Sequence, residues 1–205
     1  MALLELLIKD GWLKNPLIIE AFTKIKRKDF LNWKGDGAED LSEINEALPI
    51  GHGQTISQPL TVAFMLELLD PKPGNKILDI GSGSGWTTAL LSQIAGERGK
   101  VIAVEIIPEL KEFGENNNRK YNFVQKGIAE FHLADGSKGF EKESPFDRIL
   151  VSASSKRIFK AWKDQLKTGG KIVAPVKNSI RFLEKKPDHT FKEIEYQGFA
   201  FVPLV

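Results

Sequence analysis

The segment 76–86, which reads KILDIGSGSGW, places an acidic residue, Asp79, just before a run of alternating glycines. Its apolar residues predict a short strand, and residues 87–95 predict a helix. In α/β proteins a strand, a tight glycine turn and a helix hold a nucleotide-like ligand at the carboxyl end of the strand, because backbone N–H groups are free there. We therefore expect the active site at this turn.

Two further acidic residues follow predicted strands in the same way. Glu105 ends the next apolar run, roughly 20 residues after the glycine turn, and a carboxylate at that position binds the two hydroxyls of a ribose in such folds. Asp135 ends the strand predicted over 129–134. Both residues strengthen the prediction of a nucleoside site. For Asp79 and Asp135 an alternative stays open, because aspartate is also a common turn former at strand ends.

Trp86 distinguishes between two kinds of ligand that the glycine turn could bind. The dinucleotide fingerprint G-x-G-x-x-G needs a third glycine for close packing of helix on strand, and the indole of Trp86 stands at that position. The pattern D-x-G-x-G-x-G instead resembles the first motif of class I methyltransferases, which bind S-adenosylmethionine. By this resemblance the turn and Asp79 hold the methionyl end, Glu105 binds the ribose, and Asp135 lies near the adenine.

The segment 47–59, ALPIGHGQTISQP, is the second informative stretch. Two glycines flank His52, hydroxyl side chains follow, and Pro59 opens a helix predicted to about Leu69. A polar loop that enters a helix start presents free N–H groups, which favours a carboxylate site. From spacing alone, Ser57 is better explained as a helix cap and His52 as a turn residue.

The order of the predicted elements indicates the fold class. Helices are predicted at 2–10, 16–26, 59–69, 87–95, 108–121 and 158–166, and strands at 101–104, 129–134, 146–152, 171–176, 180–185 and 191–202. Alternating strands and helices imply an α/β fold with a doubly wound, mainly parallel sheet, preceded by N-terminal helices. Together with the resemblance of the glycine turn to the methyltransferase motif, this implies a Rossmann-like methyltransferase fold. The last two strands have no helix between them and predict a C-terminal antiparallel hairpin. Gly169-Gly170 is expected to close the helix before them.

Length and composition set further bounds. The 205 residues, 41% of them hydrophobic, predict one domain over 1–205, with a helical and substrate-loop region at 1–56 and an α/β core at 57–205. The absence of cysteine excludes a disulfide framework, a thiolate metal site and a cysteine nucleophile, and it fits a reducing cytoplasm. No stretch is apolar over the roughly 18 residues that a membrane span needs. We expect a cytoplasmic protein without a membrane contact.

The net charge of +2 is unevenly distributed. The segment from position 156 to position 192 contains eleven basic residues and only three acidic ones. Such a cluster attracts anionic partners, for example RNA. Few aromatic residues are interleaved to stack bases, so solvated lysines on surface faces are the simpler explanation, and a nucleic-acid partner is not expected.

Several blocks together resemble the protein-L-isoaspartate O-methyltransferase family. They are LPIGHGQTISQP, VAFMLELL, ILDIGSGSGW, VEIIPEL, ADG, SPFDRILVSA, QLKTGGKIVAPV and FVPL, in the family's order and spacing from about Arg27 onward. The G-x-G-Q-T-I-S-x-P block is the most specific of them. The resemblance implies a repair enzyme that transfers a methyl group from S-adenosylmethionine to the α-carboxylate of L-isoaspartyl residues in aged proteins, releasing S-adenosylhomocysteine and using no metal.

The resemblance also implies residue roles. Ser57 is expected to touch the substrate carboxylate as the catalytic residue, which reverses the preference for capping, although both roles suit a helix start. Gln54 and Thr55 would shape the loop above it, and Ser152 would lie beside the substrate. The residues implied for the cofactor are Asp79, Gly81, Ser82, Gly83, Gly85, Glu105, Ile106, Asp135 and Gly136.

Two segments depart from the family pattern, both on the substrate side. Lys177 follows VAPV where the family has a glycine, and the family's VTAAA segment is here VSASS, followed by Lys156 and Arg157. Three alternatives therefore stay open: a relative that methylates another carboxylate, one that methylates RNA, and a non-catalytic protein that binds S-adenosylmethionine. Isoaspartyl proteins or peptides are the expected partners, and a monomer is the expected state.

Overall fold

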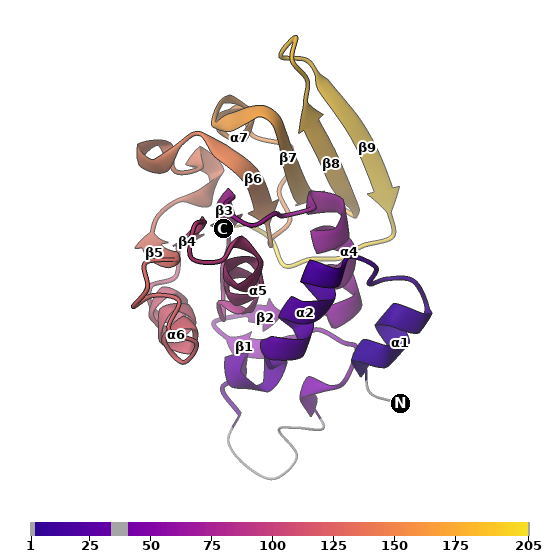
Figure 1. Cartoon of the computed structure of the whole chain (residues 1–205), viewed down its shortest axis with the longest axis vertical. Helices are drawn as coiled ribbons and strands as arrows, with labels where there is room; N and C mark the ends of the chain where they lie inside the picture. Colours follow the sequence, from indigo (N-terminus) through magenta and orange to yellow (C-terminus); the bar gives the residue numbers. More distant parts are fainter. Residues whose placement is uncertain (1–2, 34–40, 205) are drawn as a thin grey trace.

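The computed structural model describes residues 3–33 and 41–204. A seven-stranded sheet at its centre has the order β5-β4-β3-β6-β7-β8-β9 (Figure 1). The strands are β3 Lys76–Ile80, β4 Lys100–Glu105, β5 Ala129–Leu133, β6 Phe146–Val151, β7 Leu166–Val176, β8 Ser179–Lys185 and β9 Phe191–Gln197. Strands β3 to β7 pair in parallel, and β8 and β9 are antiparallel. The predicted α/β class, mainly parallel sheet and C-terminal hairpin are confirmed.

The parallel strands are buried on both faces, as their nearly continuous apolar sequences require. Successive side chains point to opposite faces, so Ile77 and Val101 belong to one core while Leu78 and Ile102 belong to the other. All four of these side chains are fully buried. Packing on both faces holds the strands rigidly, so the loops that follow their carboxyl ends are held in fixed positions.

Helices cover the two faces unequally. On one face lie α4 Pro59–Leu69, α5 Trp86–Ala95 and α6 Pro108–Arg119, with α2 Pro16–Lys24 packed on α4 and α5 and α1 Leu3–Lys9 beyond it (Figure 1). Proline opens α2, α4 and α6, where a helix needs no N–H. Among the described residues no helix is long and apolar enough to cross a bilayer.

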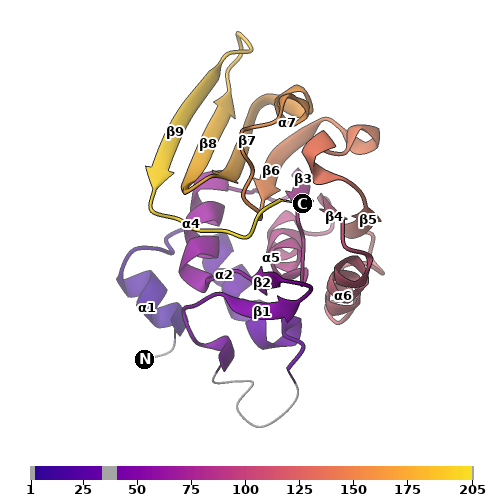
Figure 2. The same ribbon diagram turned by 180° about the vertical axis from the view of Figure 1, so that it is seen from behind.

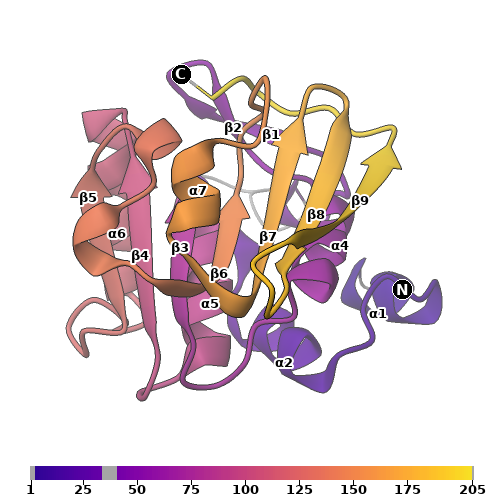
Figure 3. The ribbon, with the colours of Figure 1, turned by 90° about the horizontal axis from the view of Figure 1, so that it is seen from above.

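Within residues 3–33 and 41–204, the elements on the opposite face are short. They are α7 Lys160–Asp164 and the 3-10 turns η2 Gly136–Lys138 and η3 Glu141–Glu143, with α7 in front of the sheet in Figure 3. Trp162 of α7 is fully buried in the core on this face, and its Nε1 donates to the carbonyl oxygen of Gly136 at 2.8 Å. One indole therefore fixes both the helix and the turn after β5.

The region around Gly169-Gly170 differs from the sequence prediction. These glycines do not close a helix over 158–166: α7 ends at Asp164, and β7 already begins at Leu166. The pairing of β6 with β7 shifts register between Phe146 and Arg148, so the extra residues form an irregularity within the strand. A Cβ on Gly170 would lie 2.8 Å from Leu166 Cγ, which explains why a glycine is needed there.

Two segments outside the main sheet cross its carboxyl end. The stretch predicted as a loop contains a hairpin, β1 Leu48–Gly51 and β2 Gln54–Ile56, whose turn takes positive φ angles at Gly51, His52 and Gly53. Strand β9 ends earlier than the predicted residue 202, and residues 198–204 run beneath β8, β7 and β6 in Figure 2; we call them the C-terminal strap. Ser154 N donates to Val202 O at 2.8 Å and holds the strap in place.

Candidate active site

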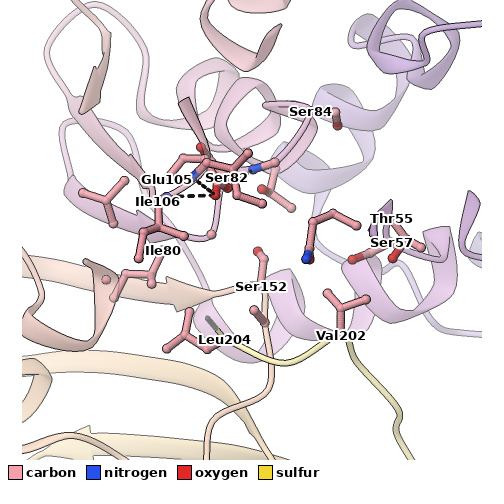
Figure 4. Close-up of a pocket in the computed structure, with 18 of the residues that line it drawn as sticks. Thr55, Ser57, Ile80, Ser82, Ser84, Glu105, Ile106, Ser152, Val202 and Leu204 are labelled. Carbon is pink, nitrogen blue, oxygen red and sulfur yellow. Dashed lines mark hydrogen bonds between the residues drawn. The ribbon is translucent and has the colours of Figure 1, made fainter. Parts of the chain in front are cut away.

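A cleft opens at the carboxyl ends of β3, β4 and β6, where the strand order changes direction (Figure 4). Open α/β sheets bind ligands at such a point. The cleft contains about 700 Å³ of space, including space open to solvent at its mouth. Ten predicted site residues line it: Gln54, Thr55, Ser57, Gly81, Ser82, Gly83, Glu105, Ile106, Gly136 and Ser152.

The glycine turn forms one wall of the cleft. Gly81 and Gly83 have φ angles of 74° and 52°, a region that only glycine adopts freely. The N–H groups of Gly81 and Ser82 donate to Val104 O at 2.9 and 3.2 Å, which anchors the turn to β4. The Ser82 hydroxyl is buried and has no partner within the described part of the chain. It is therefore available to a polar ligand.

Glu105 joins this turn to the end of β4. Its Oε2 accepts a hydrogen bond from Gly83 N at 2.9 Å, and its Oε1 accepts from Ile106 N and Ile107 N at 2.9 and 3.1 Å (Figure 4). An ionised carboxylate offers about four acceptor sites, so roughly one is left for a ligand hydroxyl. Glu105 thus shapes the turn as well as facing the cleft, whereas the sequence predicted only the second role.

Asp79 lies beneath the glycine turn and does not line the cleft. Its Oδ2 accepts from the hydroxyls of Thr87 and Thr88 on α5, at 2.9 and 2.7 Å. Complete burial raises the pKa of Asp79 to about 6, against the lowering effect of the Thr88 and Thr87 hydrogen bonds. The side chain points to the start of α5 and joins that helix to β3, while its Oδ1 has no hydrogen-bond partner among the described residues. The expected contact with a methionyl group stays a prediction.

Gly85 is a second predicted residue that faces away from the cleft. It has a φ angle of 81°, and a Cβ there would lie 2.5 Å from Asn118 Nδ2 and 2.7 Å from Gly114 O. Both neighbours belong to α6. Gly85 is therefore required for the close approach of α5 and α6, which is a packing role.

Asp135 is the third predicted residue outside the cleft wall. It caps η2: its Oδ1 accepts from Ser137 N at 3.0 Å, and the hydrogen bonding from Ser137 lowers the pKa of Asp135. Lys138 Nζ lies 3.3 Å from its other oxygen. The turn-forming role that the sequence left open for Asp135 is observed, and its neighbour Gly136 lines the cleft. Its expected position near the adenine stays a prediction.

Ser57 lies on the opposite wall, between β2 and α4. The cap position of α4 is occupied by Gln58, which makes no side-chain cap bond, and the N–H of Leu60 donates to Asn45 Oδ1 at 3.0 Å. Helix capping is therefore not the role of Ser57. Within the described residues its only hydrogen bond is through its backbone carbonyl, so the hydroxyl is available to a substrate.

Arg27 lies behind this wall and stabilises it. The sequence did not predict it as a site residue. The side chain is buried, and its Nη2 donates to the carbonyl oxygens of Glu46 and Ser57 at 2.7 and 3.2 Å, while Nη1 donates to two further carbonyls in the same region. Its Cζ lies 5.5 Å from the centre of the Trp86 ring. Burial lowers the pKa of Arg27 to about 10, so the group stays protonated at neutral pH.

A second depression adjoins the cleft and shares a wall with it. Thr55, Ser57, Ser152 and Val202 line both hollows (Figure 4). The far side of the second depression is formed by the segment 46–47 and by residues 200–201 of the C-terminal strap. The sequence did not indicate that the strap reaches the site. Two neighbouring hollows whose common wall carries the hydroxyl groups of Thr55, Ser57 and Ser152 suit a reaction between two bound molecules.

The sheet order, the glycine turn after β3 and the carboxylate at the end of β4 define a methyltransferase of the class that uses S-adenosylmethionine. The family model for protein-L-isoaspartate(D-aspartate) O-methyltransferase (PCMT) matches residues 1–205. The protein-L-isoaspartate O-methyltransferase of Methanopyrus kandleri is 39% identical over 207 residues, covering 99% of this chain and 89% of that protein. The one from Pyrococcus horikoshii is 40% identical over 208 residues, covering 98% and 90%.

Solved structures agree with this assignment. A PCMT structure from Plasmodium falciparum in complex with S-adenosyl-L-homocysteine has a TM-score of 0.86 at 23% identity, covering 99% of this chain and 96% of that one. Another protein-L-isoaspartate O-methyltransferase has a TM-score of 0.87 at 26% identity, covering 98% and 64%. The chain belongs to the PCMT family. The predicted family, enzyme class and S-adenosylmethionine cofactor are confirmed.

Proposed function

We propose that this protein methylates the α-carboxylate of L-isoaspartyl residues in damaged proteins, with S-adenosylmethionine as the donor. The observation that carries the proposal is the common wall of the two hollows, formed by Thr55, Ser57, Ser152 and Val202. A donor in the cleft and a carboxylate in the second depression would meet at this wall. Membership of the PCMT family supports the choice of acceptor.

The residues of the cleft fit the donor. Ser82 offers a buried hydroxyl without a partner, and Glu105 retains acceptor capacity for a ribose hydroxyl. Ile106 and Ile107 add apolar surface for a flat base. At Gly136 a Cβ would lie 2.4 Å from Ile80 Cγ2, so the wall is closely packed there without a side chain. When bound, S-adenosylmethionine supplies a methyl group on a positively charged sulfur.

The acceptor side needs orientation more than proton transfer. A carboxylate with an ordinary pKa near 4 is already ionised at neutral pH, so no strong base is required. We assign Ser57 to donate its hydroxyl hydrogen to one carboxylate oxygen, with Gln54 and Thr55 above it and Ser152 on the facing loop. Holding the reacting groups in line lowers the barrier by removing their freedom to misalign. The protonated Arg27 behind Ser57 adds a favourable field for the anion.

The test uses labelled S-adenosylmethionine with an isoaspartyl peptide, its normal aspartyl twin and an RNA pool. Base-labile label on the isoaspartyl peptide alone is the expected result, because a methyl ester hydrolyses in base. Label on RNA would make the protein a nucleic-acid methyltransferase. Binding of the donor without any label would make it a non-catalytic relative. Either result would overturn the proposal.

We also propose that the chain works as a monomer in the cytoplasm and folds as one domain over 1–205. The packing of α2 of the N-terminal region on α4 and α5 of the core supports a single domain. The cysteine-free sequence accords with a reducing compartment. Sedimentation equilibrium should give a mass near 22.9 kDa, and a single thermal transition should accompany it.

A further inference from the structure

A basic surface is lined by residues of the loop after β6, of α7, of the turn between β7 and β8, and of β8 and β9. The ribbon of these elements can be followed in Figure 3. Its charged residues are Lys156, Arg157, Lys163, Lys177, Arg181, Glu193 and Glu195. Arg181 pairs with both glutamates, at 3.0 and 2.9 Å. No carboxylate within the described residues pairs with any of the other four cations. The surface therefore carries uncompensated positive charge.

Lys177 occupies a strained backbone position on this surface. Its φ angle is 55°, and it is the first of two residues in the turn that joins the paired residues Val176 and Ser179. Glycine adopts this region freely, whereas a residue with a Cβ does so at a cost. Strain that persists in a folded protein points to a function for the residue that carries it.

The loop after β6 links the basic surface to the acceptor side of the site. Ser154, two residues after Ser152, donates its hydroxyl to Lys177 O at 3.0 Å, and Lys177 N donates to Ser155 O at 3.1 Å. From Ser152 to Lys156 the chain spans at most about 14 Å, since each residue extends at most ~3.6 Å. A peptide whose isoaspartyl residue lies beside Ser152 would cover that distance with roughly four of its own residues.

We propose that this basic surface binds acidic side chains near the isoaspartyl residue of a substrate, so that the enzyme prefers acidic protein segments. The inference rests on the proposed function and defines the substrate class of the same site. Separate carboxylates suit the separate cations Lys156, Arg157 and Lys177. RNA suits the surface less well, because its described lining has no aromatic side chain to stack bases.

The test compares isoaspartyl peptides that share one core and carry Glu, Gln or Lys at the flanking positions, first on one side of the isoaspartyl residue and then on the other. On one of the two sides we expect KM to rise in the order Glu, Gln, Lys, with roughly a fivefold difference between Glu and Gln. The difference should shrink at about 0.5 M NaCl, where exposed charges are screened.

Variants locate the effect. The triple variant K156Q/R157Q/K177Q should abolish the difference between the Glu and Gln peptides. A matched triple variant, K9Q/K14Q/K126Q, makes the same change in net charge at exposed lysines elsewhere and should retain the difference. The single variant Lys177→Gly removes a charge and the strain together. It should raise the melting temperature while reducing the preference for Glu.

Each contrary result has a distinct meaning. Equal KM values for the wild-type enzyme with Glu and Gln peptides overturn the surface proposal and leave the proposed function intact. Failure to methylate any isoaspartyl peptide overturns both. Inhibition of methylation by RNA that disappears in K156Q/R157Q/K177Q, without a preference for Glu, would assign the surface to nucleic acid and overturn the peptide proposal.

Discussion

The guanidinium of Arg27 donates a hydrogen bond to the carbonyl oxygen of Ser57 at 3.2 Å, so a buried cation fixes the backbone of the serine between the two hollows. The same guanidinium lies 5.5 Å from the ring of Trp86, the first residue of α5. Because α5 directly follows the glycine turn, one side chain links the acceptor wall to the donor wall. Arg27 is therefore a positioning residue for both.

Arg27→Lys tests this link. Lysine keeps the charge but lacks the planar fork that serves several carbonyls, so we expect kcat for an isoaspartyl peptide to fall roughly tenfold. The Kd of S-adenosylhomocysteine, measured by calorimetry, should change far less. Arg27→Met should destabilise the fold by about 2 kcal/mol or more, because buried carbonyls lose their donors. Wild-type kcat in Arg27→Lys would reduce Arg27 to a purely structural role.

Ser57→Ala tests the assigned contact with the carboxylate. Loss of one hydroxyl donor to an anion should lower kcat/KM by roughly 10- to 100-fold, while the Kd of S-adenosylhomocysteine stays within about twofold of wild type. Thr23→Ala, which removes an exposed hydroxyl bonded to Ile19 O on α2, is the control and should behave as wild type. An equal loss of cofactor affinity in Ser57→Ala would show that Ser57 belongs to the donor side.

The sequence predicted those parts of the site whose signals are local. The glycine turn and Glu105 follow strands within a few residues, and an apolar run with its terminal residues is enough to place them. Arg27 was not found because its partners lie up to 30 positions away and a single arginine between apolar residues is common. For the same reason Val202 was not placed beside Ser152. For Asp79 the position was predicted, but the orientation of its side chain was not. Its carboxylate accepts hydrogen bonds from the hydroxyls of Thr87 and Thr88 on α5, and the sequence did not indicate these contacts.

Glu105→Gln should weaken cofactor binding nearly as much as Glu105→Ala. The amide has one acceptor oxygen, so either Gly83 N or the N–H groups of Ile106 and Ile107 would face an NH₂ group. We expect the Kd of S-adenosylhomocysteine to rise at least roughly tenfold in both variants, with a lower melting temperature. Titration calorimetry and thermal unfolding measure these effects. Unchanged affinity in Glu105→Gln would remove Glu105 from the binding site.

Gly85→Ala should destabilise the protein through a collision with α6. Gly74 offers a matched control, since its φ angle is 80° against 81° at Gly85, but a Cβ on Gly74 would meet nothing within 4 Å. Gly74→Ala should therefore cost only the strain of the left-handed region, about 1 to 2 kcal/mol. Gly85→Ala should cost clearly more, because α6 must shift. Equal losses in urea unfolding would show that the contact with Asn118 and Gly114 does not matter.

Asp79 should make stability depend on pH below neutrality. Its pKa is raised to about 6 in the folded state, against roughly 3.9 in an unfolded chain. Between these two values the folded state holds a proton that the unfolded state has lost, so this contribution is fully present below about pH 4 and is lost as the pH rises to about 6.

Asp79→Asn isolates this effect, because an amide oxygen still accepts from Thr87 and Thr88 but does not ionise. The measurement is the free energy of unfolding in urea for both proteins at several pH values, taken as the difference between variant and wild type so that other titrating groups cancel. The difference should shift in favour of Asp79→Asn from about pH 4 to about pH 6 and be constant above that. A difference that does not vary with pH would mean that Asp79 ionises with an ordinary pKa, and that burial beneath the glycine turn does not retain its proton.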